Sequence, residues 1–358
     1  MTVPHLRALL SLTAADALGA ATEFKTPQAI QARYGPRIET YQPGSVFGFA
    51  PGEATDDSQM TLATLLGYAR RQGLGGVVQA LREWLATGPP DVGSLTRQAL
   101  SWHTRQGGPG DGLDDRVDGG VRAWQASGFQ SAGNGGLMRI AAVWLAGFQG
   151  AALAREATVV TALTHADPRC VHASVFFTAF LERLDPGEPA GRPDFTEAAR
   201  SALGVMDEFD ARAALLDAGL FGVELRAAHA GFGERDREAR AQVRARVRSG
   251  LDGHLTSQSG YVLDTLEAAL VHARTADLSD DWLSGVQPAV MLGDDSDTVA
   301  CVVGALLGAR GLEVPAPLLP PLRLGHSWPG WGRDWACTEH FGRLLGSAVE
   351  GARQCPEP

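Results

Sequence analysis

The sequence is short of several features that mark particular classes of protein. It holds 4 cysteines among 358 residues, and none of them forms a C-x-x-C pair, which is typical of buried thiols in a reducing cytoplasm. No uninterrupted apolar stretch reaches the roughly 18 residues of a membrane-spanning helix. The N-terminus also lacks a basic region followed by a long apolar segment. We therefore expect a soluble, cytoplasmic protein without a membrane partner.

Basic residues are scarce as well. The 31 lysines and arginines, among which Lys25 is the single lysine, stand against 41 acidic residues, so the net charge is -10. Such a chain lacks the basic face that general nucleic-acid or anionic-membrane binding needs. In contrast, 44% of the residues are hydrophobic, and a chain of this length can bury a large core. We interpret residues 1–358 as a single globular domain.

Helical periodicity dominates the sequence, and the alternating patterns of strands are nearly absent. Glycine- and proline-rich segments at 107–112, 185–189 and 314–322 separate the helical stretches. The charged stretch 234–248 has helical spacing and predicts an exposed helix face without chemistry. The sequence thus predicts a compact all-α fold with helices at 6–18, 60–71, 76–86, 95–103, 136–146, 151–163, 169–184, 195–207, 210–218, 236–251, 262–275, 299–310 and 338–352.

Two acidic clusters are the most informative feature. Thr55-Asp56-Asp57 and Asp294-Asp295-Ser296-Asp297-Thr298 each directly precede a run of small and apolar residues that is typical of a buried helix. If the two helix beginnings meet, their carboxylates and hydroxyls form an all-oxygen pocket, which suits Mg²⁺, Mn²⁺ or Ca²⁺ rather than zinc. Alternatively, each cluster only caps its helix, because Asp, Ser and Thr accept hydrogen bonds from the free N–H groups of a first turn.

Seven motifs, in order along most of the chain, resemble the ADP-ribosylglycohydrolase family. Two residues depart from the family pattern: Ala15 replaces the usual glycine before Asp16, and Asp294 occupies a position that is often glycine. The motifs are Ala15-Asp16-Ala17-Leu18-Gly19 with Glu23, Thr55-Asp56-Asp57-Ser58-Gln59-Met60, Pro90-Asp91-Val92-Gly93, Gly133-Asn134-Gly135-Gly136-Leu137-Met138-Arg139, Thr164-His165-Ala166-Asp167, Ser259-Gly260-Tyr261-Val262 and the segment 293–298.

This resemblance implies a compact all-α fold with a dinuclear Mg²⁺ or Mn²⁺ centre at helix N-termini, which binds the ribose of an ADP-ribosyl group. Two divalent cations orient substrate oxygens and lower the pKa of bound water, as hydrolysis of a ribosyl C1 bond demands. Asp294 is set apart as a helix cap or as an additional charge behind the ligands. The implied metal ligands are Thr55, Asp56, Asp57, Asp295, Asp297 and Thr298.

The resemblance also implies roles for acidic residues near the reacting bond. Glu23 matches a family glutamate that reaches the reacting ribose, and the alternative is an exposed loop carboxylate. Asp91 resembles a family aspartate near the scissile bond, although it could equally cap the helix that begins near residue 95. Asp16 is expected to hold the scaffold by hydrogen bonds, since an unpaired buried carboxylate is costly. Asp56 and Asp295 are candidate catalytic groups as well as ligands.

A second set of residues is expected to bind the substrate. The glycine loop Gly133-Asn134-Gly135 precedes an expected helix, so its backbone N–H groups can approach a pyrophosphate, whereas a plain tight turn is the alternative. His165 could hydrogen-bond a phosphate or ribose, or be structural. Tyr261 could wall the pocket beside the metals, or pack in the core. Arg139 is expected to support the loop from behind, and the aromatic stretch 326–335 to be structural.

The sequence therefore predicts a metal-dependent hydrolase for de-ADP-ribosylation, whose partner is an ADP-ribosylated protein or a small ADP-ribosyl conjugate. The resemblance leaves open whether an arginine, serine, acyl or nucleic-acid linkage is cleaved, which metal is used, and which oligomer forms. One alternative is a catalytically inert protein of the same fold that binds ADP-ribose or metal. Another is a metal-dependent phosphohydrolase that acts on the pyrophosphate. The identity of the product, AMP or ADP-ribose, separates these functions.

Overall fold

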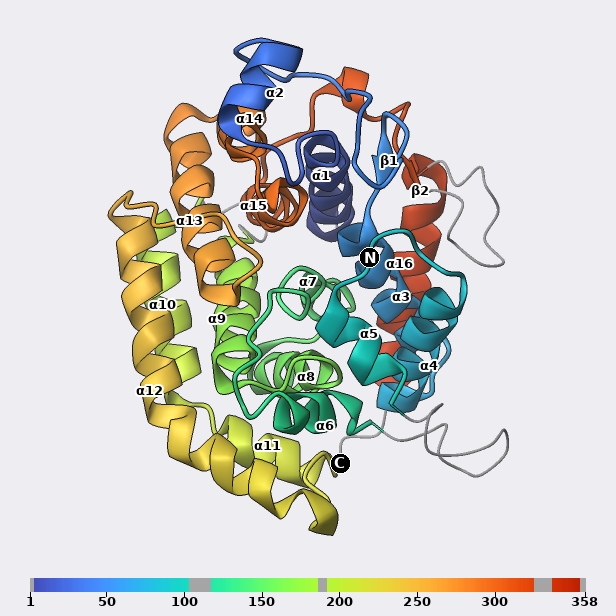
Figure 1. Ribbon diagram of the computed structural model, residues 1–358, viewed down its shortest axis with the longest axis vertical. Helices are drawn as coiled ribbons and strands as arrows, with labels where there is room; N and C mark the ends of the chain where they lie inside the picture. Colours follow the sequence, from blue (N-terminus) through green and yellow to red (C-terminus); the bar gives the residue numbers. More distant parts are fainter. Residues whose placement is uncertain (1–2, 103–116, 186–191, 325–336, 355–358) are drawn as a thin grey trace.

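The computed structural model describes residues 3–102, 117–185, 192–324 and 337–354, and it is built almost entirely of helices (Figure 1). The prediction of an all-α fold is confirmed. The aromatic stretch 326–335 lies outside the described residues. The helices are α1 (Val3–Gly19), α2 (Pro27–Tyr34), α3 (Asp56–Ala69), α4 (Gly73–Ala86), α5 (Ser94–Leu100), α6 (Gly119–Ala126), α7 (Ala141–Leu145), α8 (Gly150–Ala162), α9 (Pro168–Leu184), α10 (Phe195–Glu208), α11 (Ala211–Asp217), α12 (Arg226–Leu251), α13 (Val262–Ser279), α14 (Trp282–Leu292), α15 (Ser296–Arg310) and α16 (Cys337–Gln354), with short 3₁₀ turns η2 (Val223–Leu225) and η3 (Ala316–Leu318).

Among the described residues there is one two-stranded sheet. Strand β1 (Glu53–Ala54) pairs in parallel with β2 (Arg323–Leu324), with Glu53 opposite Arg323. The short pairing fixes the chain just before α3, and it therefore positions the first acidic cluster relative to the rest of the fold.

Three helices were not predicted from the sequence, and two predicted helices begin five or more residues from their expected starts. In α2 only Ile30 is buried, so its apolar pattern is weak; α6 begins with two glycines; and α14 contains Pro288 in its interior. Helix α12 begins at Arg226, ten residues before the expected start. Residues 136–140 form turns, and α7 begins only at Ala141. We expected the glycine loop to stand at the beginning of a helix, and this prediction was wrong.

Helices α1 and α15 pack side by side in the upper half of the view (Figure 1). Their backbones approach so closely that a Cβ on Gly304 would lie 2.6 Å from the Ser11 carbonyl oxygen, and one on Gly308 would lie 2.5 Å from the Ala8 Cα. Residue numbers rise along α1 as they fall along α15, so the helices are antiparallel. The end of α1, at Gly19, therefore meets the beginning of α15, where a Cβ would lie 2.5 Å from the Asp297 Cα.

The remaining helices surround this pair. Helix α3 packs against α4 and α16, and α9 packs between α8 and α10. A smaller apolar cluster, which includes Trp124 and Phe232, lies under α6, α11 and the first part of α12. Cys170 and Cys301 are buried free thiols, as expected. Within the part of the chain that is described, no helix combines the length and the apolar character that crossing a bilayer requires.

Candidate active site

The beginning of α3 is capped by a residue from another helix. Asp16, which is buried near the end of α1, accepts hydrogen bonds from the Thr55 backbone N–H (3.1 Å) and hydroxyl (2.6 Å), and from the Ser58 backbone N–H (3.1 Å). Burial raises the pKa of Asp16 to about 6, although these hydrogen bonds oppose the shift. Asp16 thus holds the scaffold as expected. Because it accepts the Ser58 N–H of the first turn, the carboxylates of Asp56 and Asp57 are not needed to cap that group.

The beginning of α15 differs from the expectation for Asp294. Asp295 precedes the helix, whereas Asp294 is exposed and has a left-handed backbone with a φ of 52°. The Asp294 carbonyl oxygen accepts a hydrogen bond from the Phe24 N–H (2.7 Å), and its N–H donates to the Lys25 carbonyl oxygen (3.2 Å). Asp294 is therefore not the helix cap. The other expected role, an additional charge behind the ligands, agrees with the structure, because burial, and then the charge of Asp294, raise the pKa of Asp295. The Asp294 backbone also ties the loop that follows Glu23 to the second acidic cluster.

The fold brings the two acidic clusters together. One carboxylate oxygen each from Asp16, Asp57 and Asp297 lie within 4.8 Å of one another, and so do one each from Glu23, Asp91 and Asp297. Asp297 belongs to both groups, which makes them adjacent parts of one acidic centre. The acidic residues of this centre could hold a metal ion.

The electrostatics of the centre favour a bound cation. Burial, together with the nearby carboxylates of Asp297 and Asp91, raises the pKa of Glu23 to about 11. Burial and neighbouring carboxylates raise the pKa of Asp91 to about 7 and those of Asp56, Asp57 and Asp297 well above their usual range. One oxygen of Glu23 and one of Asp57 are buried without a hydrogen-bond partner among the described residues. Such groups are unfavourable unless they are protonated or a cation neutralises them.

The donor set also fits the ions that were expected. The Thr55 hydroxyl donates to an Asp57 oxygen at 3.0 Å, and Thr298 is buried beside Asp297, whose carboxylate accepts its N–H at 2.9 Å. Carboxylate and hydroxyl oxygens without Cys or His are ligands that Mg²⁺ and Mn²⁺ prefer. The residues therefore fit the group that the sequence implied.

A buried amide holds the loop that carries the second cluster. The Gln258 side-chain N–H₂ donates to the carbonyl oxygens of Ala289 (3.0 Å) and Gly293 (3.2 Å), and its backbone carbonyl accepts the Asp295 N–H (3.3 Å). Its remaining oxygen lies 3.1 Å from the His272 Nε2. Because Gln258 joins the end of α14 to Asp295, it fixes the approach of α15 to the acidic centre. Sequence reasoning missed this residue, which carries no motif of its own.

The histidine of this network predicts a dependence of stability on pH. Burial lowers the pKa of His272 from 6.5 to about 4. A base whose pKa is lowered in the folded protein contributes stability above the pKa of the unfolded chain, and this contribution is lost as the pH falls. Between about pH 7.5 and pH 5, we expect the unfolding free energy of the wild type to fall by about 2 kcal/mol more than that of His272→Gln. Urea denaturation at both pH values measures this difference, and parallel changes in the two proteins would contradict it.

A cavity of about 270 Å³ opens over the acidic centre. Five carboxylates, the glycine loop and His165 all line this cavity, so the predicted catalytic and substrate-binding residues largely share one space. Thr55, Asp57 and Tyr261 do not line it. The lining residues are Glu23, Phe24, Asp56, Asp91, Gly93, Ser94, Leu95, Thr96, Gly133, Asn134, Gly135, Met138, His165, Gly260, Asp295, Asp297 and Thr298.

The structure contradicts the alternative roles that were considered for Glu23 and Asp91. Glu23 is not an exposed loop carboxylate, since it is 3% exposed. Asp91 does not cap α5, because Gly93 occupies the position before that helix. Instead, Asp91 is hydrogen-bonded to Asp56 and faces the same cavity as Glu23.

The glycine loop is joined to the second acidic cluster. The Asn134 side chain donates hydrogen bonds to Asp295 (2.6 Å) and to the Thr265 hydroxyl (2.9 Å). The predicted substrate-binding residue Asn134 therefore also orients a predicted metal ligand, a link that spacing along the sequence does not reveal. A Cβ on Gly135 would lie 2.9 Å from the His165 ring. Only glycine fits there without displacing the histidine.

The other side of this loop is supported by a buried arginine. Arg139 donates to the carbonyl oxygens of Gly135 (3.0 Å) and Val160 (3.0 Å) and to the Thr164 hydroxyl (2.8 Å). As expected, it supports the loop from behind. Burial, and then the charge of Arg139, lower the pKa of His165 to about 3, so this imidazole is neutral at physiological pH.

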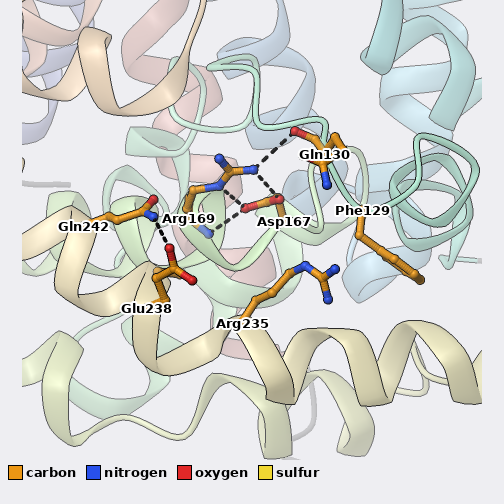
Figure 2. A pocket seen from close by; sticks show the side chains of 8 residues that line it. Phe129, Gln130, Asp167, Arg169, Arg235, Glu238 and Gln242 are labelled. Atoms are coloured by element: carbon orange, nitrogen blue, oxygen red, sulfur yellow. Dashed lines mark hydrogen bonds and ion pairs between the residues drawn. The ribbon is translucent and has the colours of Figure 1, made fainter.

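Tyr261 contacts Arg169, which lines a neighbouring pocket of about 150 Å³ (Figure 2). The Arg169 guanidinium lies 5.6 Å from the centre of the Tyr261 ring and donates to its hydroxyl at 3.4 Å. Figure 2 shows Arg169 hydrogen-bonded to Asp167 and to the Gln130 backbone. Asp167 also accepts from the Trp124 indole N–H (2.9 Å). Tyr261 therefore packs against neighbouring side chains, and it does not form a wall of the cavity beside the metals.

The fold and the acidic cavity define an almost entirely helical protein whose carboxylates could hold a metal ion in a cavity that is also lined by a glycine loop. The sequence model of the ADP-ribosylglycohydrolase family matches residues 5–345, so the chain belongs to this family. It is 26% identical over 332 residues to the ADP-ribosylarginine hydrolase Tri1 of Serratia proteamaculans (strain 568), an alignment that covers 88% of this chain and 74% of that protein. It is 27% identical to the ADP-ribosylarginine hydrolase Tri1 of Pseudomonas putida (strain GB-1) over 373 aligned positions, which cover 98% of this chain and 79% of the relative.

A solved structure described as an ADP-ribosylglycohydrolase-related protein complex has the same fold. It superposes with a TM-score of 0.63 at 22% sequence identity and covers 99% of this chain and 98% of its own.

Proposed function

We propose that this single-domain chain is a metal-dependent hydrolase that cleaves the glycosidic bond between ADP-ribose and a modified side chain or a small conjugate. The observation that carries the proposal is the convergence of Glu23, Asp91 and Asp297, with one carboxylate oxygen each within 4.8 Å, in a cavity that the glycine loop also lines. Family membership supports the reaction class. The printed activity of the two relatives makes arginine-linked ADP-ribose the first substrate to test.

Six residues are proposed to hold two divalent cations, Mg²⁺ or Mn²⁺. Bound there, such ions would orient the ribose hydroxyls and lower the pKa of water. Asn134, through its bond to Asp295, and Asp16, through its bonds to Thr55, keep ligands from both helices in place. The proposed ligands are Thr55, Asp56, Asp57, Asp295, Asp297 and Thr298.

Glu23 and Asp91 are proposed to transfer the protons of the reaction. Hydrolysis places a hydroxyl on the ribose C1 and returns a proton to the leaving nitrogen or oxygen, so one group must accept a proton and one must donate it. Both carboxyls face the cavity, and Asp91 is hydrogen-bonded to the proposed ligand Asp56, which keeps it next to the proposed metal centre. The N–H groups of Gly133 and Gly135 are proposed to bind the pyrophosphate, and the neutral His165 beside them to hydrogen-bond a phosphate or the ribose.

The proposal predicts that free ADP-ribose is released from modified peptides only when a divalent cation is present. Arginine-linked and serine-linked ADP-ribosyl peptides are incubated with the protein and Mg²⁺ or Mn²⁺, with and without chelator, and the products are separated by chromatography. We expect ADP-ribose from at least one peptide, no release with chelator, and recovery after metal is restored. AMP as the product would instead indicate a phosphohydrolase. Binding of ADP-ribose without release from any substrate would indicate an inert binding protein.

A further inference from the structure

An exposed aromatic side chain stands at the mouth of the acidic cavity. Phe24 directly follows Glu23, lines the same cavity and is 65% exposed. Exposing a large apolar ring to water is unfavourable by itself, and at the cavity the ring is accessible to a bound ligand.

The position of this ring is fixed by its surroundings. Phe24 has a left-handed φ of 54°, which is strained for a residue other than glycine, and its N–H is hydrogen-bonded to Asp294. Its ring meets the edge of the Phe47 ring at a centroid distance of 5.9 Å. The Lys25 ammonium donates to the Gly44 carbonyl oxygen at 2.9 Å, which ties the loop that carries Phe47 to the loop that carries Phe24. A strained backbone held in this way indicates that the outward placement of the ring serves a function.

The ring lies beside one of the carboxylates that are proposed to act on the bond. Phe24 directly follows Glu23 along the chain, and both residues line the cavity together with Asp91. A planar cation bound beside Glu23 and Asp91 would have both carboxylates and an aromatic ring near it. Guanidinium groups stack on aromatic faces and pair with carboxylates, whereas a neutral seryl oxygen has no charge for either group to attract.

We propose that Phe24 is a specificity-determining residue that recognises the guanidinium of an arginine-linked ADP-ribosyl group. This inference rests on the proposed hydrolase function and deepens it by assigning the leaving-group site. It restricts the preferred substrate class to side chains or small molecules that carry a guanidinium.

The experiment compares Phe24→Ala, Phe24→Leu and Phe24→Trp with the wild type on arginine-linked and serine-linked ADP-ribosyl peptides in the presence of Mn²⁺ or Mg²⁺. Inhibition by free ADP-ribose, which lacks the leaving group, reports the rest of the site. The Leu variant keeps the apolar surface but loses the aromatic face, and the Trp variant keeps that face. Val223→Ala is the matched control, because Val223 is 75% exposed and lies on η2, outside the residues that line the cavity.

We expect the Ala and Leu variants to raise the KM for the arginine-linked peptide by roughly three- to tenfold, the range of an aromatic–cation contact. The kcat, the inhibition constant of ADP-ribose and any activity on the serine-linked peptide should stay unchanged, and the Trp variant should resemble the wild type. Equal changes for both peptides, a normal Leu variant or an unaffected Ala variant would overturn the inference while the hydrolase function stands. A wild type that cleaves only the serine-linked peptide would also overturn the inference and leave the hydrolase function standing. A wild type that releases ADP-ribose from neither peptide would refute the proposed function itself.

Discussion

Replacement of both Asp56 and Asp295 by asparagine is expected to lower the rate of ADP-ribose release on the order of a thousandfold or more, because loss of metal binding removes several kcal/mol of transition-state stabilisation. The two residues come from different helices, α3 and α15, and both line the acidic cavity. The change therefore removes one carboxylate from each half of the proposed centre. Release is measured with the peptide that the wild type cleaves.

The same double variant separates loss of metal binding from loss of folding. Burial raises the pKa of both carboxyls in the metal-free protein, so removing two of these crowded acids should leave the metal-free melting temperature unchanged or higher. The increase in melting temperature that Mn²⁺ gives the wild type should disappear. Asp294→Asn is the matched control, since Asp294 is exposed and adjacent, and it should keep both the activity and the metal-induced shift. Normal activity of the double variant would refute the proposed metal site.

Glu23→Gln is expected to lower kcat by roughly a hundred- to ten-thousandfold, the range for loss of a general acid or base. The glutamine keeps the size of the side chain but cannot accept or release a proton. Because one Glu23 oxygen is buried and makes no hydrogen bond with the described residues, the change should disturb the fold little. Single-turnover kinetics measure the rate, and titration with ADP-ribose should show that binding is largely retained.

Asp91→Asn serves as the companion to this variant. Both side chains face the cavity, and the pKa of Asp91 is raised less than that of Glu23. A larger loss of kcat in Asp91→Asn than in Glu23→Gln would assign the main proton transfer to Asp91. Loss of metal-induced stabilisation in Glu23→Gln would instead make Glu23 a metal ligand and contradict its proposed role.

The helices that sequence periodicity predicted well are those with long apolar runs. Helices α1, α3, α9 and α15 lie within a few residues of their expected ranges, because burial of one helical face imposes the pattern directly. Helices α2, α6 and α14 were missed, since a mostly polar surface, two initial glycines and an internal proline each obscure that pattern. Residues 136–140 form turns, so the helix that was expected directly after the glycine loop begins only at Ala141. Binding of a phosphate by a helix dipole therefore does not explain that loop.

The sequence by itself determined the all-α class, the two acidic helix beginnings and, through its motifs, the family and most residues of the cavity. Side-chain type and local periodicity suffice for the fold class and the helix beginnings, because both act over a few neighbouring residues, whereas the family and the cavity residues came from the resemblance. Only the tertiary structure decided that Asp16 caps α3, that Asn134 and Gln258 hold Asp295 and its loop, and that Tyr261 contacts Arg169. These contacts join segments that are far apart in the chain, and the close antiparallel packing of α1 and α15 joins residues nearly three hundred positions apart. Two acidic clusters that could each have been a helix cap thereby became one centre.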